Sequence, residues 1–181
     1  MAKILLNVGA GSATSLPAGY PASEWMQVRM DIDKECAPEL VLDALELVNQ
    51  PADAYHAVYC SHTLEHFYRH DVAKVLAGMH HVLRPEGSVE VYVPDLGALF
   101  ARIRQGSLDI TDVWYRTGNG TPITFHDVLF GWGQMLQSGN LYYAHKCGFT
   151  NVHLHAQLRA AGFTDIQLGS DGFNLRAWAR K

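Results

Sequence analysis

Short apolar runs bounded by glycine, proline or acidic residues recur along the chain and predict β-strands. Residues 3–8 are apolar almost throughout, which is typical of a buried strand, whereas Val89, Val91 and Val93 alternate with polar neighbours. The predicted strands are residues 3–8, 27–31, 39–42, 57–61, 88–93, 165–168 and 175–179.

A helical spacing of apolar residues over positions 63–82 predicts a long helix there. The residues in this pattern are Leu64, Phe67, Val72, Val75, Leu76, Met79 and Val82. Further predicted helices are residues 95–103 with Asp95 as N-cap, residues 150–161, and one turn at residues 44–49. Residues 12–25 are not expected to form a long helix, because Pro17, Gly19 and Pro21 interrupt them.

Alternating strands and helices predict an α/β protein with a mainly parallel sheet. Ligands of such sheets bind beyond the carboxyl ends of the strands. The residues expected at this edge are Gly9, Gly11, Asp31, Asp43, residues 60–62 and residues 94–95.

Residues 105–148 differ from the rest, because they are rich in both glycine and aromatic residues. We interpret them as an insertion with at least one helix near residues 127–136, within a single domain that spans residues 1–181. The aromatic residues are suited to a small core of their own, to a lid or acceptor pocket, or to the contact of a homodimer.

Composition narrows the class of protein. The 181 residues are 48% hydrophobic and 18% charged, as in a globular domain, and no apolar run is long enough to span a membrane. A net charge of −4 without a basic block argues against nucleic acid as a partner. The 3 cysteines are scattered, which disfavours a disulfide framework, and the amino terminus shows no signal-peptide pattern, so we expect a cytoplasmic protein.

The strongest chemical signal is a pair of glycines after the first strand, with an acid at the end of the second. Gly9 and Gly11 let a ligand approach the backbone, and Asp31 is placed to accept hydrogen bonds from ribose hydroxyls. A tight turn without a ligand and a solvated Asp31 are the alternatives. Because the glycines and the acid occur together, we favour nucleoside binding.

Six motifs in order resemble the class I S-adenosylmethionine-dependent methyltransferases, and in particular a small bacterial subgroup. They are residues 6–11 (LNVGAG), 30–33 (MDID), 42–44 (LDA), 61–66 (SHTLEH), 82–87 (VLRPEG) and 93–96 (VPDL). The resemblance implies a Rossmann-like fold with an antiparallel last strand and the aromatic insertion before the last helix. It also implies methyl transfer from S-adenosylmethionine to a small or medium acceptor.

The resemblance further implies which residues bind the cofactor. They are Asn7, Gly9 and Gly11 beside the methionine part, Asp31 at the ribose, Ile32, Asp43 and Ala44 at the adenine, and Cys60, Ser61 and His62 near the sulfonium. Two features depart from the family pattern: Asn7 stands where many relatives have a carboxylate, and residues 12–21 replace a regular first helix. Asp43 is equally suited to be a helix N-cap.

Residues 62–66 also match the His-x-x-Glu-His pattern of some zinc peptidases, in which the two histidines of a helix bind the metal. Such a site needs a further glutamate downstream, but Glu90 is the last glutamate of the chain. We therefore expect no metal here. Glu65 is more suited to bracing the start of the helix, and His62 to lining the pocket.

The candidate catalytic residues are His62, His126 and His145, because an imidazole titrates near neutral pH. Histidines held only by packing are the alternative for His126 and His145. A nicotinamide-dependent oxidoreductase is a rival function, although Thr14 occupies the position of its third glycine. A non-catalytic nucleoside-binding protein with a degenerate site is the second rival.

Overall fold

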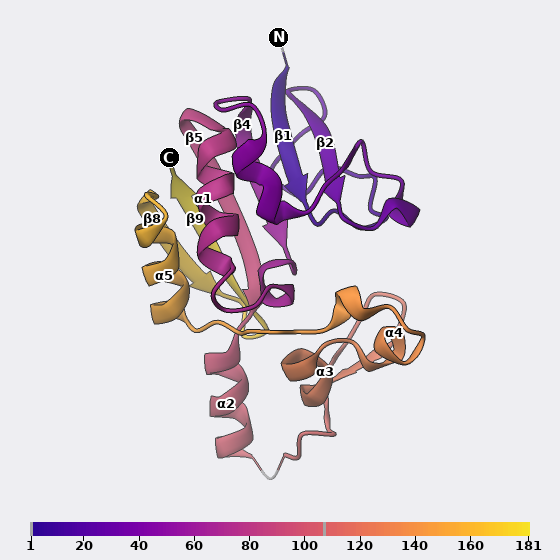
Figure 1. Ribbon diagram of the computed structural model, residues 1–181. Coiled ribbons are helices and arrows are strands. Elements are labelled where there is room, and N and C mark those ends of the chain that lie inside the picture. Colours follow the sequence, from indigo (N-terminus) through magenta and orange to yellow (C-terminus); the bar gives the residue numbers. More distant parts are fainter. Residues whose placement is uncertain (1, 107) are drawn as a thin grey trace.

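The computed structural model describes residues 2–106 and 108–181. Seven strands form one sheet in the order β3-β2-β1-β4-β5-β9-β8 (Figure 1). The strands are β1 (Lys3–Val8), β2 (Trp25–Asp31), β3 (Leu40–Val41), β4 (Tyr55–Ser61), β5 (Leu83–Pro94), β8 (Thr164–Ser170) and β9 (Asn174–Arg180). Strands β1 to β5 pair in parallel, whereas β9 runs antiparallel to β5 and β8. The predicted α/β fold with a mainly parallel sheet and an antiparallel last strand is therefore confirmed.

The strand order reverses direction between β1 and β4, which lie side by side in the middle of the sheet. From β1 the chain moves outward through β2 to β3, and it then returns to add β4 and β5 on the other side. In parallel sheets this reversal opens a crevice at the carboxyl ends of the strands. The fold thus places the ends of β1, β2 and β4 around one crevice.

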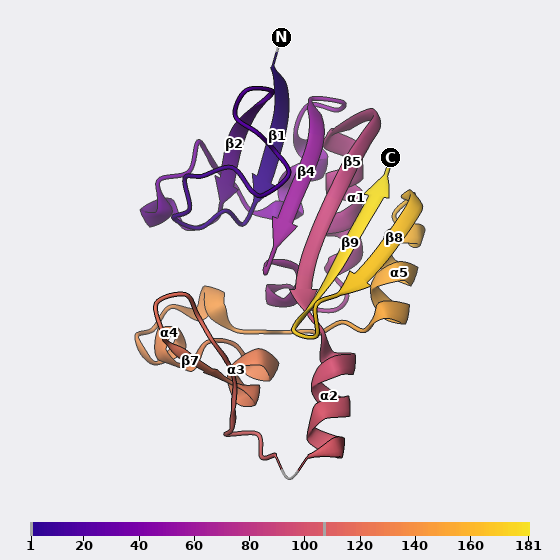
Figure 2. The same ribbon diagram turned by 180° about the vertical axis from the view of Figure 1, so that it is seen from behind.

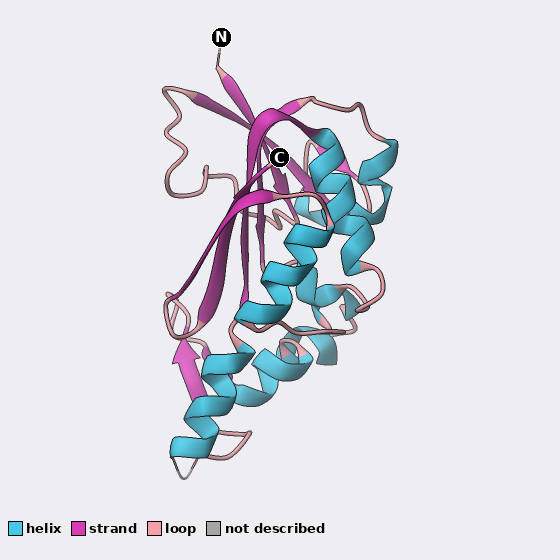
Figure 3. Cartoon of the chain, turned by 90° about the vertical axis from the view of Figure 1, so that its left-hand side faces the viewer, coloured by secondary structure: helices cyan, strands magenta, loops and turns pink. Residues whose placement is uncertain are grey.

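The helices that pack on the sheet cover one face of it. They are α1 (Val72–Val82), α5 (Asn151–Ala160) and the short 3-10 helix η2 (Ala44–Asn49). Figures 1 and 2 show α1 and α5 in front of the sheet in one view and behind it in the other, and Figure 3 shows this layering from the side. Their apolar residues and the inward side chains of β1, β4, β5 and β9 form the main core, in which Leu6, Val58, Met79 and Val91 are fully buried.

Aromatic and charged side chains line the opposite face of the sheet. Among the described residues, no helix contributes to the small hydrophobic cluster on this face. Tyr20, from the loop after β1, packs against Trp25 with ring centroids 4.9 Å apart. The buried carboxylate of Glu90 accepts hydrogen bonds from Tyr20 (3.2 Å), Tyr92 (2.9 Å) and Arg176 (2.7 Å). Burial and the neighbouring Glu90 raise the pKa of Tyr92 to about 12, so that its hydroxyl remains a donor to Glu90 at neutral pH.

We expect Glu90→Ala to lower the free energy of unfolding by about 2–4 kcal/mol, because the variant leaves the buried Tyr20 hydroxyl without its acceptor. Urea unfolding followed by circular dichroism measures this change. The exposed Glu35 provides the control, and Glu35→Ala is expected to change stability by less than about 0.5 kcal/mol. Equal unfolding midpoints for the two variants would show that the Glu90 network does not support the sheet.

The insertion forms a second, smaller core beyond the carboxyl ends of the strands (Figure 2). The elements of the insertion are β6 (Val113–Arg116), β7 (Pro122–Thr124), α3 (Phe125–Phe130), α4 (Gly133–Gln137) and η4 (Leu141–Tyr143), and the preceding helix α2 (Leu96–Gln105) contributes to the same core. Leu99, Trp114 and Phe125 are buried in this core. Thr124 and Asp127 begin α3 with reciprocal side-chain hydrogen bonds to the backbone, which is a capping box. The sequence predicted a helix in this segment but not the β6–β7 hairpin.

The predicted helix over residues 63–82 is wrong in its first half. His62 has a left-handed backbone, with φ of 51°, and the chain then makes only a short 3-10 helix, η3 (Leu64–His66). Thr63 is held out of a helix because its hydroxyl bonds to the carbonyls of Val8 (3.2 Å) and Ser61 (3.1 Å). Leu64 and Phe67 still pack into the main core. Their apolar spacing therefore reflects burial and not a continuous helix.

Among the described residues, no helix is both long and apolar enough to cross a lipid bilayer.

Candidate functional site

The turn after β1 is bonded directly to the acid at the end of β2. Gly9 and Gly11 both have positive φ, of 69° and 55°. The backbone N–H of Gly11 donates to one oxygen of Asp31 at 2.8 Å, and the N–H of Asp33 donates to the other at 2.9 Å. An ionised carboxylate has about four lone-pair sites, so these two bonds leave Asp31 able to accept two more. The acid thus lies beside the glycine turn with capacity for a ligand.

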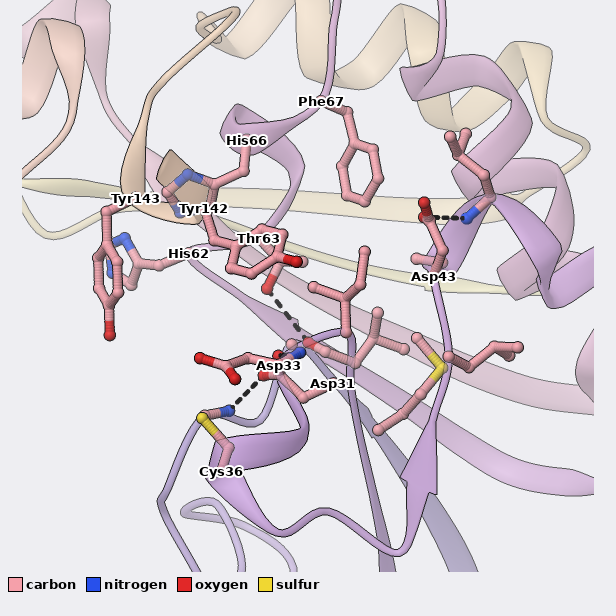
Figure 4. Close-up of a pocket in the computed structure, with 18 of the residues that line it drawn as sticks. Asp31, Asp33, Cys36, Asp43, His62, Thr63, His66, Phe67, Tyr142 and Tyr143 are labelled. Carbon is pink, nitrogen blue, oxygen red and sulfur yellow. Dashed lines mark hydrogen bonds between the residues drawn. The ribbon is translucent and has the colours of Figure 1, made fainter. Parts of the chain in front are cut away.

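A cavity of about 420 Å³ opens between this turn, η2 and η3 (Figure 4). This volume lies in the usual range for small-molecule sites. In Figure 4, Asp31 and Asp33 lie on one side, Asp43 lies on another, and His62, His66, Tyr142 and Tyr143 are grouped together. Ile32 lines the cavity with 43% of its surface exposed, so it offers an apolar surface to a ligand.

The lining residues make the cavity acidic. They include four aspartates, Asp31, Asp33, Asp43 and Asp71, and a single lysine, Lys146. An acidic cavity favours a cationic ligand. The negative charge comes from side chains that line the cavity. It therefore does not require the carboxylate that many relatives have at the position of Asn7.

Most of the predicted cofactor residues lie together in this cavity. Those that line it are Gly9, Gly11, Asp31, Ile32, Asp43, Ala44 and His62. Asp43 also accepts a hydrogen bond from the N–H of Leu45 at 2.9 Å, so it is both a cavity residue and the N-cap of η2. The sequence had left these two roles of Asp43 as alternatives.

Three other predicted residues do not line the cavity. The amide of Asn7 donates to the side chain of Gln27 at 3.1 Å. Cys60 is fully buried in the main core, where burial raises the pKa of its thiol, and Ser61 ends β4 outside the cavity lining. Side chains alternate between the faces of a strand, so Cys60 lies under the helices and Ser61 points to the other face. His62 follows the end of β4 with a left-handed backbone and lines the cavity.

The candidate catalytic histidines occupy different places. His62 lines the cavity. His126 is exposed on α3 and packs against Phe130, with ring centroids 4.8 Å apart. His145 lies behind the cavity lining, where its Nδ1 bonds to the carbonyl of Val128 at 2.8 Å. Only the first of these three side chains faces the space that a ligand would occupy.

Several lining residues were not predicted from the sequence. They are Asp33, Cys36, Phe67, Tyr68, Asp71 and Lys146, whereas Tyr142 and Tyr143 belong to the aromatic residues for which an acceptor pocket was one of the alternatives. Asp33 lies within the MDID motif and could have been inferred from it. Tyr142, Tyr143 and Lys146 come from the insertion, whose route back to the sheet cannot be read from local sequence.

Residues 6–91 match the family model of a methyltransferase domain. By this match, residues 6–91 are a methyltransferase domain. The family resemblance inferred from the sequence motifs is thereby confirmed. No curated protein matches the chain.

Solved structures share the fold of this methyltransferase domain. A SAM-dependent methyltransferase from Archaeoglobus fulgidus is 14% identical with a TM-score of 0.63, over 99% of this chain and 86% of that one. The 1,6-didemethyltoxoflavin-N1-methyltransferase of Burkholderia thailandensis, solved with S-adenosylhomocysteine, is 18% identical with a TM-score of 0.57, over 99% of this chain and 71% of that one.

A structure from Bordetella parapertussis, described as a "possible exported protein", is 16% identical with a TM-score of 0.63. The match covers 99% of the present methyltransferase chain but 62% of that protein. At such identities the likeness is one of fold, and it extends through the insertion as well as the sheet.

Proposed function

We propose that this methyltransferase transfers the methyl group of S-adenosylmethionine to a small acceptor molecule bound between the sheet and the insertion. The observation that carries the proposal is the carboxylate of Asp31, held 2.8 Å from the backbone N–H of Gly11 at the mouth of the cavity. Methyl transfer from a sulfonium needs positioning and exclusion of water more than it needs a strong base. A site without a conventional catalytic triad is therefore sufficient.

Each part of the cofactor has a matching surface in this arrangement. The ribose hydroxyls would donate to the two remaining lone-pair sites of Asp31. The adenine would lie against Ile32, with Asp43 and Ala44 beside it. The methionine part would pass Gly9 and Gly11, and the acidic lining would favour its positive charges.

The acceptor would enter from the side of the insertion. His62 lines this side together with His66, Tyr142 and Tyr143, which come from η3 and η4 (Figure 4). We assign the acceptor contact to His62 among the three candidate histidines, since it is the one that lines the cavity. A structure with bound S-adenosylhomocysteine tests this assignment, which fails if the sulfur lies far from the His62 ring.

The rival ligand, a nicotinamide dinucleotide, fits the site less well. Its pyrophosphate needs the N-terminus of a helix directly after the glycine turn. The described chain from Gly11 to Glu24 instead forms turns and bends without a helix. A dinucleotide would therefore lack the backbone donors that normally hold its phosphates.

A thermal-shift measurement with S-adenosylhomocysteine and with NADH tests the proposed function. We expect the melting temperature to rise by about 5–10 °C when S-adenosylhomocysteine exceeds its dissociation constant about 100-fold, and to stay unchanged with NADH. A rise with NADH alone would identify an oxidoreductase. No rise with either ligand would overturn the proposal and favour a degenerate site.

A further inference from the structure

Glu65 is an acidic residue that the methyl-transfer site does not use. It lies in η3, next to the cavity, and only 1% of its surface is exposed. Neither carboxylate oxygen has a hydrogen-bond partner among the described residues, and the nearest ionisable group, Nδ1 of His62, forms an ion-pair contact at 3.3 Å from Oε1. A buried carboxylate without donors is costly, and such a group commonly faces a water molecule or an ion.

Two histidines beside Glu65 each hold one ring nitrogen against a backbone carbonyl. Nδ1 of His66 lies 3.1 Å from the carbonyl oxygen of Ala144, and Nδ1 of His145 lies 2.8 Å from that of Val128. Since a carbonyl oxygen only accepts, each Nδ1 carries a proton, and Nε2 is the nitrogen of each ring that would bind a metal ion. A histidine whose second nitrogen donates to a backbone carbonyl is the usual form of a metal-binding imidazole.

We propose that Glu65, His66 and His145 form a binding site for one first-row divalent metal ion, and for Zn²⁺ in particular. One ligand atom from each residue lies within 4.8 Å of the others. Neighbouring ligands of a tetrahedral zinc ion are about 3.3–3.5 Å apart, so the side chains need to move inward by about 1 Å. Two imidazoles and one carboxylate are a common ligand set of zinc sites that keep an open position, whereas Mg²⁺ and Ca²⁺ prefer oxygen ligands.

A metal ion binds a carboxylate in its ionised form and an imidazole in its neutral form.

This ligand set differs from the peptidase pattern in the sequence. His62 and His66 are not one turn apart on a helix, because His62 has a left-handed backbone after β4 and only Leu64–His66 form a short 3-10 helix. The third ligand comes from the insertion instead, where the N–H groups of Lys146 and Cys147 also bond to the Glu65 carbonyl, at 2.7 and 3.3 Å. The ion would thus tie the insertion to the end of β4, with its open position near His62 and the cavity.

Zinc titration of the chelator-treated protein by isothermal titration calorimetry tests this site. We expect one Zn²⁺ per chain, and more than about 100-fold weaker binding in both Glu65→Gln and His145→Asn, since even groups that only orient a ligand contribute about 10–100-fold. His155→Asn is the matched control, because this half-buried histidine lies on α5, outside the proposed ligand set, and it should bind zinc like the parent.

Cobalt binding to the parent protein gives a second readout. Because no variant is needed, this readout does not depend on whether Glu65→Gln or His145→Asn folds. Bound Co²⁺ should show visible absorption bands of a site with nitrogen and oxygen ligands, without the charge-transfer band of a thiolate. No zinc uptake by the parent, or equal uptake by Glu65→Gln and His145→Asn, would overturn the proposal. The titration contains no S-adenosylmethionine, so its failure is distinct from failure of the proposed methyl transfer.

Discussion

Replacing Asp31 by asparagine is expected to weaken the binding of S-adenosylhomocysteine by at least about 100-fold. Hydrogen bonds to a charged group contribute about 1.5–3 kcal/mol each, and the ribose would lose two of them. Asparagine has nearly the same shape, but it has no charge and its amide would face the N–H of Gly11 or Asp33 with a donor instead of an acceptor. Calorimetric titration of the purified variant measures the change.

The control for this variant is Asp165→Asn, which removes an exposed carboxylate on β8, far along the chain from the cavity lining. It should bind S-adenosylhomocysteine like the parent. Circular dichroism would show whether the Asp31 variant keeps its secondary structure. Parent-like affinity in a folded Asp31→Asn protein would refute the assignment of Asp31 to the ribose.

Gly9→Ala is expected to lower the free energy of unfolding by about 3–5 kcal/mol, for a reason that the sequence did not show. The motif indicates that a side chain at Gly9 would occupy the ligand's space. In the structure, a Cβ on Gly9 would point at Thr63, closer to its Oγ1 than real Cβ atoms come and only 2.7 Å from its Cγ2. The positive φ adds about 1–2 kcal/mol of strain, and moving Thr63 would break its bonds to the Val8 and Ser61 carbonyls.

Gly11→Ala is the matched comparison, because a Cβ on Gly11 would meet no atom within 4 Å. It should cost only the backbone strain of about 1–2 kcal/mol, while its methyl group enters the space where the cofactor is expected. Urea unfolding should therefore separate the two variants. The double variant Gly9→Ala with Thr63→Ala should be less destabilised than the sum of the single ones, and simple additivity would contradict the proposed contact.

Local chemistry allowed much of the fold to be predicted. The strand at residues 3–8 and the turn at residues 44–49 have the predicted bounds, because apolar runs and capping residues act within a few positions. Asp95 caps α2 through the N–H of Ala98, as its position before the helix indicated. The β6–β7 hairpin was missed because residues 113–116 and 122–124 are too short for an alternating pattern to stand out.

The sequence by itself determined the parallel α/β sheet, the glycine turn after β1 and the acid at the end of β2, since these depend on short-range spacing and backbone freedom. Only the tertiary structure decided where α1 begins, what Gly9 packs against, and which polar groups meet Glu65. Thr63 bonds to Val8, and Glu65 meets His145, across long stretches of chain. Such contacts arise when β4 docks beside β1 and the insertion folds back over the strand ends, and no local pattern of residues encodes that arrangement.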